Sequence, residues 1–483
     1  MSPSNVFKTE EHENPAKWQV TFEPMLFSYL VSSILTILTN QNLFIQKACR
    51  VDLQTDADKC AELDYRGGRS DSEIDAQLLV TYMLIWQTVL QNVTTSILAV
   101  FLGSWSDRYH RRKFVLLLPI VGELVRNLCL MVCVYFFDEL PLSVAGLAQT
   151  LPVALTGGWI VLFMAVFSYI GDTSEGKMRA IRVGIVNGTV ILCFPLGTAL
   201  SGILYANFGF YGVYGISSAL FLFSIAWTGL YIHEDNFNVL LDRRPWSVSI
   251  ADFFDVKHFR KAVQTTFWNE DSTRRFSLIA LSSVIIIIKG PMIGERSIMY
   301  LYTRYKFNWN EVDYSIFSTY SMIVNLVGTG LAVYLLINKL GIDECLVGAI
   351  ALVGKIFSEI LYAFAKNDFE FYVAPLANLI YNTAIVAMKS TVTRIVPSEE
   401  LGQVSAVTSI GENLVPIAYN PLYSLVYVMS LNVFSGTIFL LGAVLTAPGI
   451  FIYLWLYKHN CNTYESIGEH KKNELKKEYG SMN

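Results

Sequence analysis

The chain has 483 residues, of which 53% are hydrophobic and only 16% are charged. Its mean hydropathy is +0.42. A soluble globular protein with so few charges is unusual, so the composition excludes that class and predicts an all-α protein that crosses a membrane many times. The net charge of −4 indicates little about the fold or its partners, because basic and acidic residues gather on different faces of the membrane.

Apolar runs of roughly 20 residues, long enough to cross a bilayer, define the predicted elements. Six lie in the first half of the chain, near 24–47, 77–102, 114–137, 148–171, 180–204 and 208–232. Six more follow, near 276–302, 312–338, 344–365, 371–394, 402–429 and 433–457. We therefore expect twelve spans in two pseudo-symmetric six-helix bundles, 22–232 and 276–458, with a cytoplasmic central loop, 233–275, and two cytoplasmic tails, 1–21 and 459–483.

The distribution of Lys and Arg predicts the orientation, since basic loops stay on the cytoplasmic side. Basic clusters lie at 108–113, at 177–182, in the central loop and in the C-terminal tail, all on one side when the spans are counted. The opposite side receives the loop 50–76 with eight acidic residues. Both termini are thus expected in the cytoplasm. Cys49 and Cys60 flank the acidic stretch outside, where oxidation is possible, and whether they pair is left open.

Two pairs of ionisable residues inside the spans have helical spacing. Glu123 and Arg126 are three residues apart in the third span, and Lys355 and Glu359 are four apart in the ninth. Such neighbours share a helix face and neutralise one another. An ion pair that fixes helix packing is favoured for both pairs, with solute contact as the alternative.

The seventh and tenth spans carry less balanced charges. In the seventh, Lys289, Glu295 and Arg296 surround Gly290-Pro291, where an interrupted helix would expose backbone groups to a cavity; functional and structural readings stay equally open. In the tenth, Lys389 has no acidic neighbour three or four residues away. An unpaired cation at that depth predicts an anionic solute or a partner on another helix.

One cytoplasmic turn carries a family resemblance. The motif Gly103-x-x-x-Asp107-Arg108-x-x-Arg111-Arg112, between the second and third spans, resembles the loop between helices 2 and 3 of major facilitator superfamily transporters. It is close to the corresponding loop of the proton-coupled folate transporter branch, solute carrier family 46. Weaker similarities follow in the same order at 22–27, 169–182, 301–309 and 396–405. The resemblance implies the major facilitator fold, and a cytoplasmic gate in which the Asp and Arg residues form charge-assisted bonds that break in each cycle.

Departures from that family concern coupling. By alignment, Asn187 replaces a proton-coupling Glu, Met292 replaces a His, and Lys389 stands in for an Arg near the solute. Neither Asn nor Met titrates near neutrality, so we expect a weaker pH dependence than in the family. The coupling candidates that remain are Glu295, Glu123 and Arg126. The expected solute site combines Lys389 and Met292 with hydrogen bonds from Tyr302 and Asn187.

The sequence thus predicts a secondary transporter that moves a small organic anion by alternating access, together with a proton or another ion. The alternative is a transporter-fold sensor or scaffold without turnover. Enzyme signatures are missing, and we expect no cofactor, metal site or nucleic-acid partner. In the tail, Tyr464-Glu-Ser-Ile467 fits the extended Tyr-x-x-apolar signal that clathrin adaptors bind. The plasma membrane and the endosomal or lysosomal membrane are therefore both expected locations.

Overall fold

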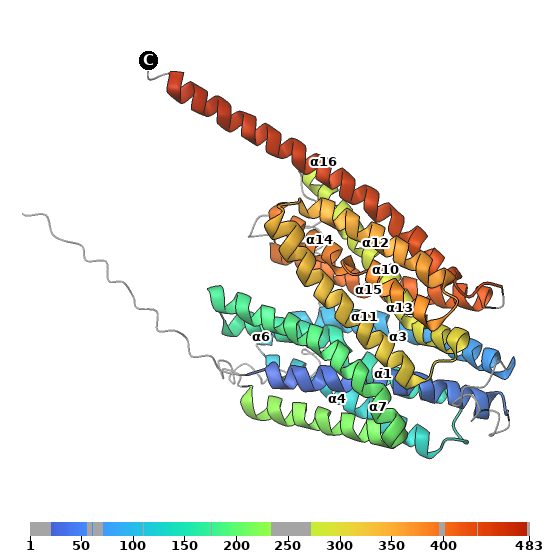
Figure 1. Cartoon of the computed structure of the whole chain (residues 1–483). Coiled ribbons are helices and arrows are strands. Elements are labelled where there is room, and N and C mark those ends of the chain that lie inside the picture. Colours follow the sequence, from blue (N-terminus) through green and yellow to red (C-terminus); the bar gives the residue numbers. More distant parts are fainter. Residues whose placement is uncertain are drawn as a thin grey trace, which may run out of the picture.

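The computed structural model describes residues 21–55, 60, 71–109, 111–174, 176–232, 272–395, 401–431 and 433–480. Within these ranges the regular structure is helical, which confirms the all-α prediction. The central loop expected at 233–275 lies outside the described residues up to residue 271, as does most of the acidic loop. Figure 1 shows the helices in two groups that lie one over the other, blue to green and yellow to red.

Among the described residues, the first half contains six long helices and one short π-helix, several of them bounded by glycine. They are α1 (Glu23–Lys47), η1 (Ala48–Asp52), α3 (Asp71–Tyr109), α4 (Arg112–Tyr135), α5 (Leu142–Thr156), α6 (Gly158–Thr173) and α7 (Gly176–Tyr231). Gly209 divides α7 with a φ of 61°, and Gly157 separates α5 from α6 with a φ of 84°. Glycine adopts such angles without steric strain, so the chain breaks or turns there. The expected fourth span is therefore two consecutive helices.

The second half repeats the pattern. Its elements are α10 (Ser272–Phe307), α11 (Glu311–Ala332), η3 (Val333–Lys339), α12 (Glu344–Phe364), α13 (Asp368–Ala377), α14 (Tyr381–Ile395), α15 (Leu401–Ser430) and α16 (Thr437–Gly480). The last helix extends well beyond the bundle (Figure 1) and carries most of the segment that was expected to be a tail.

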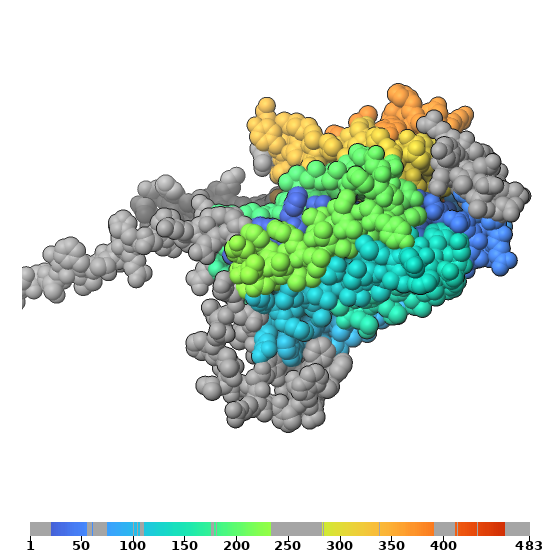
Figure 2. All heavy atoms as spheres, turned by 90° about the horizontal axis from the view of Figure 1, so that it is seen from below, coloured from blue at the N-terminus to red at the C-terminus, as the bar shows by residue number. Residues whose placement is uncertain are grey.

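The described helices bury charged pairs inside the molecule and carry exposed apolar stripes on the outside. On α4 the exposed stripe is Val121, Val125, Leu128 and Val132, while Glu123 and Arg126 are buried. On α12 the exposed stripe is Ile350, Val353, Phe357, Ile360 and Phe364, while Lys355 and Glu359 are buried. Figure 2 shows the outer face that α1 to α7 present, in blue to green. Exposed apolar stripes at helical spacing fit contact with lipid chains.

Eight stretches of the described chain are long and apolar enough to cross a membrane. One of them, Ile181–Tyr231, has 51 residues and includes the break at Gly209, so it suffices for two crossings. Helices overlap all twelve predicted spans, and the number of crossings itself stays a prediction.

The two halves are held together at one end of the molecule. There a single apolar cluster combines first-half residues, such as Phe44 and Tyr214, with second-half residues, such as Tyr300 and Tyr427. Toward the opposite end each half has a core of its own, one within 22–232 and one within 285–456. We call these the joined end and the tail end; at the latter, the indole of Trp227 donates to the carbonyl of Thr21 over 2.7 Å.

The most extensive contacts between the two halves join α3 with α15 and α7 with α11. The Tyr427 hydroxyl of α15 donates to Oε1 of Gln77 of α3 over 2.8 Å. On α7, Gly202 lies so close to α11 that an added Cβ would be 2.6 Å from Oγ of Ser315. Glycine is required there because any side chain would push the halves apart.

The interruption expected at Gly290-Pro291 is wrong, because α10 is a continuous helix through both residues. The glycines of this segment make room for aromatic rings of α15. An added Cβ would lie 2.2 Å from the Tyr419 ring at Gly290 and 2.3 Å from the Tyr423 ring at Gly294. The glycines that suggested a broken helix therefore indicate close packing between α10 and α15.

Candidate functional site

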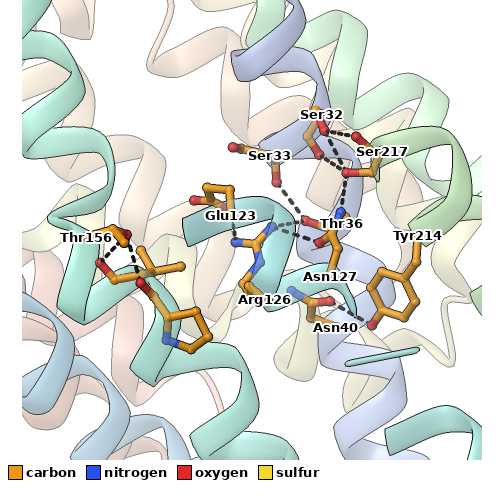
Figure 3. A network of polar contacts seen from close by, with 12 residues as sticks. Ser32, Ser33, Thr36, Asn40, Glu123, Arg126, Asn127, Thr156, Tyr214 and Ser217 are labelled. Atoms are coloured by element: carbon orange, nitrogen blue, oxygen red, sulfur yellow. Dashed lines mark hydrogen bonds and ion pairs between the residues drawn. The ribbon is translucent and has the colours of Figure 1, made fainter. Parts of the chain in front are cut away.

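Glu123 and Arg126 form the ion pair that their spacing predicts, with 2.6 Å between Oε2 and Nη1. Both side chains point into the first half, where Arg126 also donates to Oγ1 of Thr36 on α1 over 2.9 Å. Figure 3 shows the guanidinium between the Glu123 carboxylate and the polar groups of α1. One acid and one base make this pair neutral, and its bonds tie α4 to α1.

A second part of the same network joins α1, α4 and α7. The Ser32 and Ser217 hydroxyls are 2.7 Å apart, and the Asn127 amide donates to Oγ of Ser217 over 2.8 Å. Nearer the joined end, the Tyr214 hydroxyl donates to Oδ1 of Asn40 over 2.8 Å (Figure 3). These groups are buried and satisfy one another, so the network specifies the packing of the first half.

The second half contains a buried triad with unequal charges. The Lys355 ammonium lies 2.6 Å from Oε2 of Glu295 on α10 and also pairs with Glu359, one turn along α12. Lys355 and Glu359 confirm the pair predicted from their spacing. Glu295 joins them from 60 residues away, so the triad holds two carboxylates and one ammonium.

Lys289, the first of the seventh-span charges, also has a partner. Its ammonium pairs with the Glu412 carboxylate of α15. With Glu295 and Lys289 both accounted for, the remaining charge of that group is Arg296.

Arg296 is exposed and turned toward the first half. Its guanidinium lies 5.3 Å from the centre of the Phe194 ring on α7, across the interface between the halves. Among the described residues, no carboxylate pairs with it. Sequence reasoning grouped Arg296 with Glu295, but consecutive helix positions point about 100° apart. That spacing was the signal that the two could not neutralise one another.

Asn187 and Met292 lie on the helix faces that meet at this interface. Asn187 is exposed and precedes Phe194 by seven residues, which places both on one face of α7. Met292 is partly buried and precedes Arg296 by four residues, on one face of α10. Both predicted positions therefore share a helix face with a residue of the Arg296–Phe194 contact, and Met292 also packs against the core of the second half.

Tyr302 lies elsewhere. Its side chain is completely buried, with ring centroids 4.9 Å from Phe439 and 6.0 Å from Phe371, and its hydroxyl accepts from Lys306 over 2.8 Å. The predicted hydrogen bond from Tyr302 to a solute requires a side chain that is inaccessible in this conformation. Its role at the site stays a prediction.

Lys389 is exposed near the end of α14, directly before side chains that lie outside the described set. The structure describes no ion pair for it within its ranges. Its predicted role as a solute-binding cation remains open to test.

The proposed gate is described in part. Arg112, at the start of α4, donates from Nε to Oδ2 of Asp172 over 2.7 Å and from Nη1 to Oγ of Ser106 over 2.8 Å. Gly103 lets α3 approach α6, since an added Cβ would lie 2.9 Å from Sδ of Met164. Arg111 is exposed. The side chains of Asp107 and Arg108 lie outside the described residues.

At the joined end, Cys49 and Cys60 form a disulfide, which settles the question left open by the sequence. Nearby, Arg304 of α10 donates to Oδ1 of Asn42 on α1 over 3.3 Å and pairs with Glu311 at 3.4 Å. These contacts close the joined end around the interface that Arg296 faces.

The molecule has two helical halves that are joined at one end, with charged pairs buried inside and apolar stripes exposed outside. This architecture is that of a membrane transporter that exposes a central site to one side at a time. The sequence model of the Major Facilitator Superfamily matches residues 75–419. That is more than half of the chain, so the protein belongs to this superfamily.

Individual relatives agree. The chain is 21% identical over 455 residues to the probable peptidoglycan muropeptide transporter SLC46 of Drosophila melanogaster, covering 92% of this chain and 86% of that protein. It is 25% identical over 377 residues to the lysosomal proton-coupled steroid conjugate and bile acid symporter SLC46A3 of Mus musculus, covering 75% and 78%.

Among solved structures, the human organic anion transporter MFSD10 (TETRAN) has the same fold. The TM-score is 0.59 at 15% identity, over 89% of this chain and 98% of that one. These matches confirm the resemblance to solute carrier family 46. The protein is a secondary transporter of small organic solutes and not an enzyme.

Proposed function

We propose that the transported solute is an organic anion, bound between the two halves at Arg296. The observation that carries this proposal is the exposed guanidinium of Arg296 on the inter-half face, without a carboxylate partner among the described residues. A cation at membrane depth is costly unless a counter-charge reaches it. A planar guanidinium also binds a carboxylate or sulfate with two parallel hydrogen bonds.

The rest of the site is built around Arg296. Met292 supplies apolar surface from the same face of α10, and Asn187 supplies an amide from α7. Lys389 adds a second positive charge on α14. A site of this composition fits a solute with an apolar body and an acidic group. The solutes for which these relatives are named support this class, because bile acids and muropeptides carry carboxylates.

Uptake into vesicles tests the proposal. Purified protein in lipid vesicles should accumulate a radiolabelled bile acid or a radiolabelled muropeptide, and should discriminate against the same compound with its carboxylate converted to a neutral amide. Uptake of the neutral amide as fast as the acid would contradict an anion site.

Lys389 gives a separate test of the charged surface. Lys389→Gln removes the charge and keeps much of the length, so the apparent KM for the anionic probe should rise by roughly tenfold, which corresponds to about 1.4 kcal/mol. Lys389→Arg keeps the charge and should retain part of the affinity. An unchanged KM in Lys389→Gln would mean that the Lys389 ammonium does not contact the solute and only places a charge at the membrane interface.

We assign the tail end to the cytoplasm, as the basic loops predict. The joined end then faces outward and is closed, and the structure is the inward-facing state of an alternating-access cycle. In this assignment the turn with Asp107, Arg111 and Arg112 forms the cytoplasmic gate, which closes when the halves rock together.

Asp107→Ala should leave the amount of protein in the membrane largely unchanged and slow turnover per molecule, because the closed gate loses a charge-assisted bond. Initial uptake rates, normalised to protein measured by surface labelling or immunoblot, give the answer. Lys113→Ala is the control, because it removes the charge of a neighbouring basic residue, which donates to the carbonyl of Gly229 over 2.6 Å. It shows how far the loss of any charge at this membrane surface slows uptake. Equal rates in Asp107→Ala and wild type would remove Asp107 from the gate.

Membrane location and sorting are the remaining proposals. The mouse relative is named as lysosomal, and a lysosomal or endosomal membrane suits an exporter of organic anions. The segment 464–467 is helical within α16. A clathrin adaptor binds the Tyr-x-x-apolar motif in an extended conformation. Recognition of Tyr464 therefore requires this part of α16 to unwind.

A further inference from the structure

We propose that the triad of Glu295, Lys355 and Glu359 is the proton-binding site of this transporter and that one proton binds there for each organic anion bound at Arg296. This inference rests on the proposed transport of an organic anion. The proton passes from a hydronium ion in water to a carboxylate oxygen, so one O–H bond of that ion breaks as the carboxyl O–H bond forms, and release reverses this exchange.

The geometry provides one cation for two anions. Relative exposure is 4% for Glu295, 3% for Lys355 and 0% for Glu359. Because only one ammonium is present, the triad carries a net charge of −1 when both carboxylates are ionised. A buried, uncompensated charge is strongly unfavourable. Binding one proton makes the triad neutral.

Polar atoms without partners converge at one point of the triad. Oε1 of Glu295, Oε2 of Glu359 and the Tyr423 hydroxyl are buried and make no hydrogen bond within the described part of the chain. A Cβ added at Gly442 of α16 would lie 2.7 Å from Oε1 of Glu295, 3.1 Å from the Tyr423 hydroxyl and 3.3 Å from Cδ of Glu359. The two carboxyl groups and the hydroxyl therefore face one small space beside Gly442, where an added proton would be shared.

The other titratable groups around the triad are tyrosines. The Tyr381 ring of α14 lies 5.3 Å from the Lys355 ammonium, Tyr362 comes from α12 itself, and Tyr423 comes from α15. The fourth packed helix, α16, contributes Gly442. Among the described side chains around the triad, Glu295 and Glu359 are thus the carboxylic acids, and Lys355 is the cation that pairs with both.

The ion pair of the first half can be compared with the triad. Glu123 and Arg126 occupy α4, the third predicted span, and Lys355 and Glu359 occupy α12, the third span of the second half. The α4 pair is one acid with one base at 2.6 Å and needs no proton to be neutral. The additional carboxylate of Glu295 distinguishes the triad, and it comes from the helix that carries Arg296.

Glu295 and Arg296 are adjacent in α10, and this links proton binding at the triad to anion binding at Arg296. Their Cα atoms are about 3.8 Å apart, while their side chains point in different directions, about 100° apart, one toward Lys355 and one toward Phe194. Without ligands, the positive Arg296 balances the negative triad. With one anion and one proton, both sites are neutral. Either ligand alone leaves a net charge near the membrane centre, so the empty and the doubly loaded states are the ones that reorient.

The decisive measurement is infrared difference spectroscopy of the purified full-length protein in lipid, recorded between acidic and alkaline pH. Wild type should show the carbonyl stretch of a protonated, buried carboxyl group that disappears as the pH rises. Glu359→Gln should abolish this band. The variant leaves Lys355 paired with Glu295 alone, a balanced ion pair, so the fold should persist. Glu123→Gln should keep the band, and so should Glu344→Gln, which changes another acid of α12.

A band that persists in both Glu359→Gln and Glu295→Gln, or that vanishes in Glu123→Gln, would overturn the assignment. Vesicle uptake gives the functional counterpart. One proton per anion predicts that a pH gradient of one unit drives about tenfold accumulation of a labelled bile acid, and that Glu359→Gln exchanges the bile acid without responding to the gradient. The infrared result does not depend on transport. A titrating band in vesicles that move no anion would therefore refute the proposed function and leave the proton site intact.

Discussion

Arg296→Gln is expected to raise the apparent KM for an anionic solute by roughly 10- to 150-fold, with the protein still folded. A hydrogen bond to a charged group contributes about 1.5–3 kcal/mol, which corresponds to that range. The fold should tolerate the change because Arg296 is exposed and pairs with no carboxylate among the described residues. Initial rates of bile acid uptake into vesicles, measured over a range of concentrations, give the KM.

Two comparisons make this result specific. Arg296→Lys keeps the charge but loses the planar fork, so it should be intermediate. Lys289→Gln changes a cation of the same helix that is paired with Glu412, and it should affect stability more than affinity for the anion. The anion site is misplaced if Arg296→Gln has the KM of wild type.

Gly202→Leu is expected to shift the protein away from the conformation of this structure, which we propose is the inward-facing state. An added Cβ would lie 2.6 Å from Oγ of Ser315 and 2.7 Å from the carbonyl oxygen of Glu311, at the contact between α7 and α11. Overpacking typically costs about 1–3 kcal/mol. That is enough to change a two-state population by roughly 5- to 150-fold, and uptake should fall because one state of the cycle is disfavoured.

Spin-label distances report this shift directly. Labels at Tyr211→Cys and Phe369→Cys, which are 53% and 78% exposed on the two halves, should show a longer distance population in Gly202→Leu than in the otherwise unchanged protein. Gly215→Leu is the matched control, because its added Cβ meets no atom within 4 Å in the described structure. Identical distance distributions in Gly202→Leu and Gly215→Leu would refute the role of this contact.

Local spacing predicted part of the site correctly. The pairs Glu123–Arg126 and Lys355–Glu359 follow from helix geometry alone, because residues three or four apart on a helix are neighbours whatever surrounds them. The all-α fold and the superfamily followed from apolar run lengths and from the motif at 103–112. These features depend on short stretches of sequence.

The remaining site features depend on which helix faces meet. Glu295 reaches Lys355 across 60 positions, and no spacing rule indicates that contact. Tyr302 was placed beside Lys389, yet it is six residues beyond Arg296 and therefore on a different face of α10, packed on Phe439. The break expected at Gly290 was wrong because tertiary packing against Tyr419 uses the glycine for space instead.

Concentrative uptake into vesicles of stated internal volume tests the central claim, that this protein moves an organic anion across the membrane. Wild-type protein should accumulate a labelled bile acid in a saturable manner, and the amount retained should fall in proportion when the vesicles are shrunk osmotically, because the solute is in the lumen. Saturable retention that is independent of vesicle volume would show binding without transport, and it would replace the transporter by a sensor with the same fold.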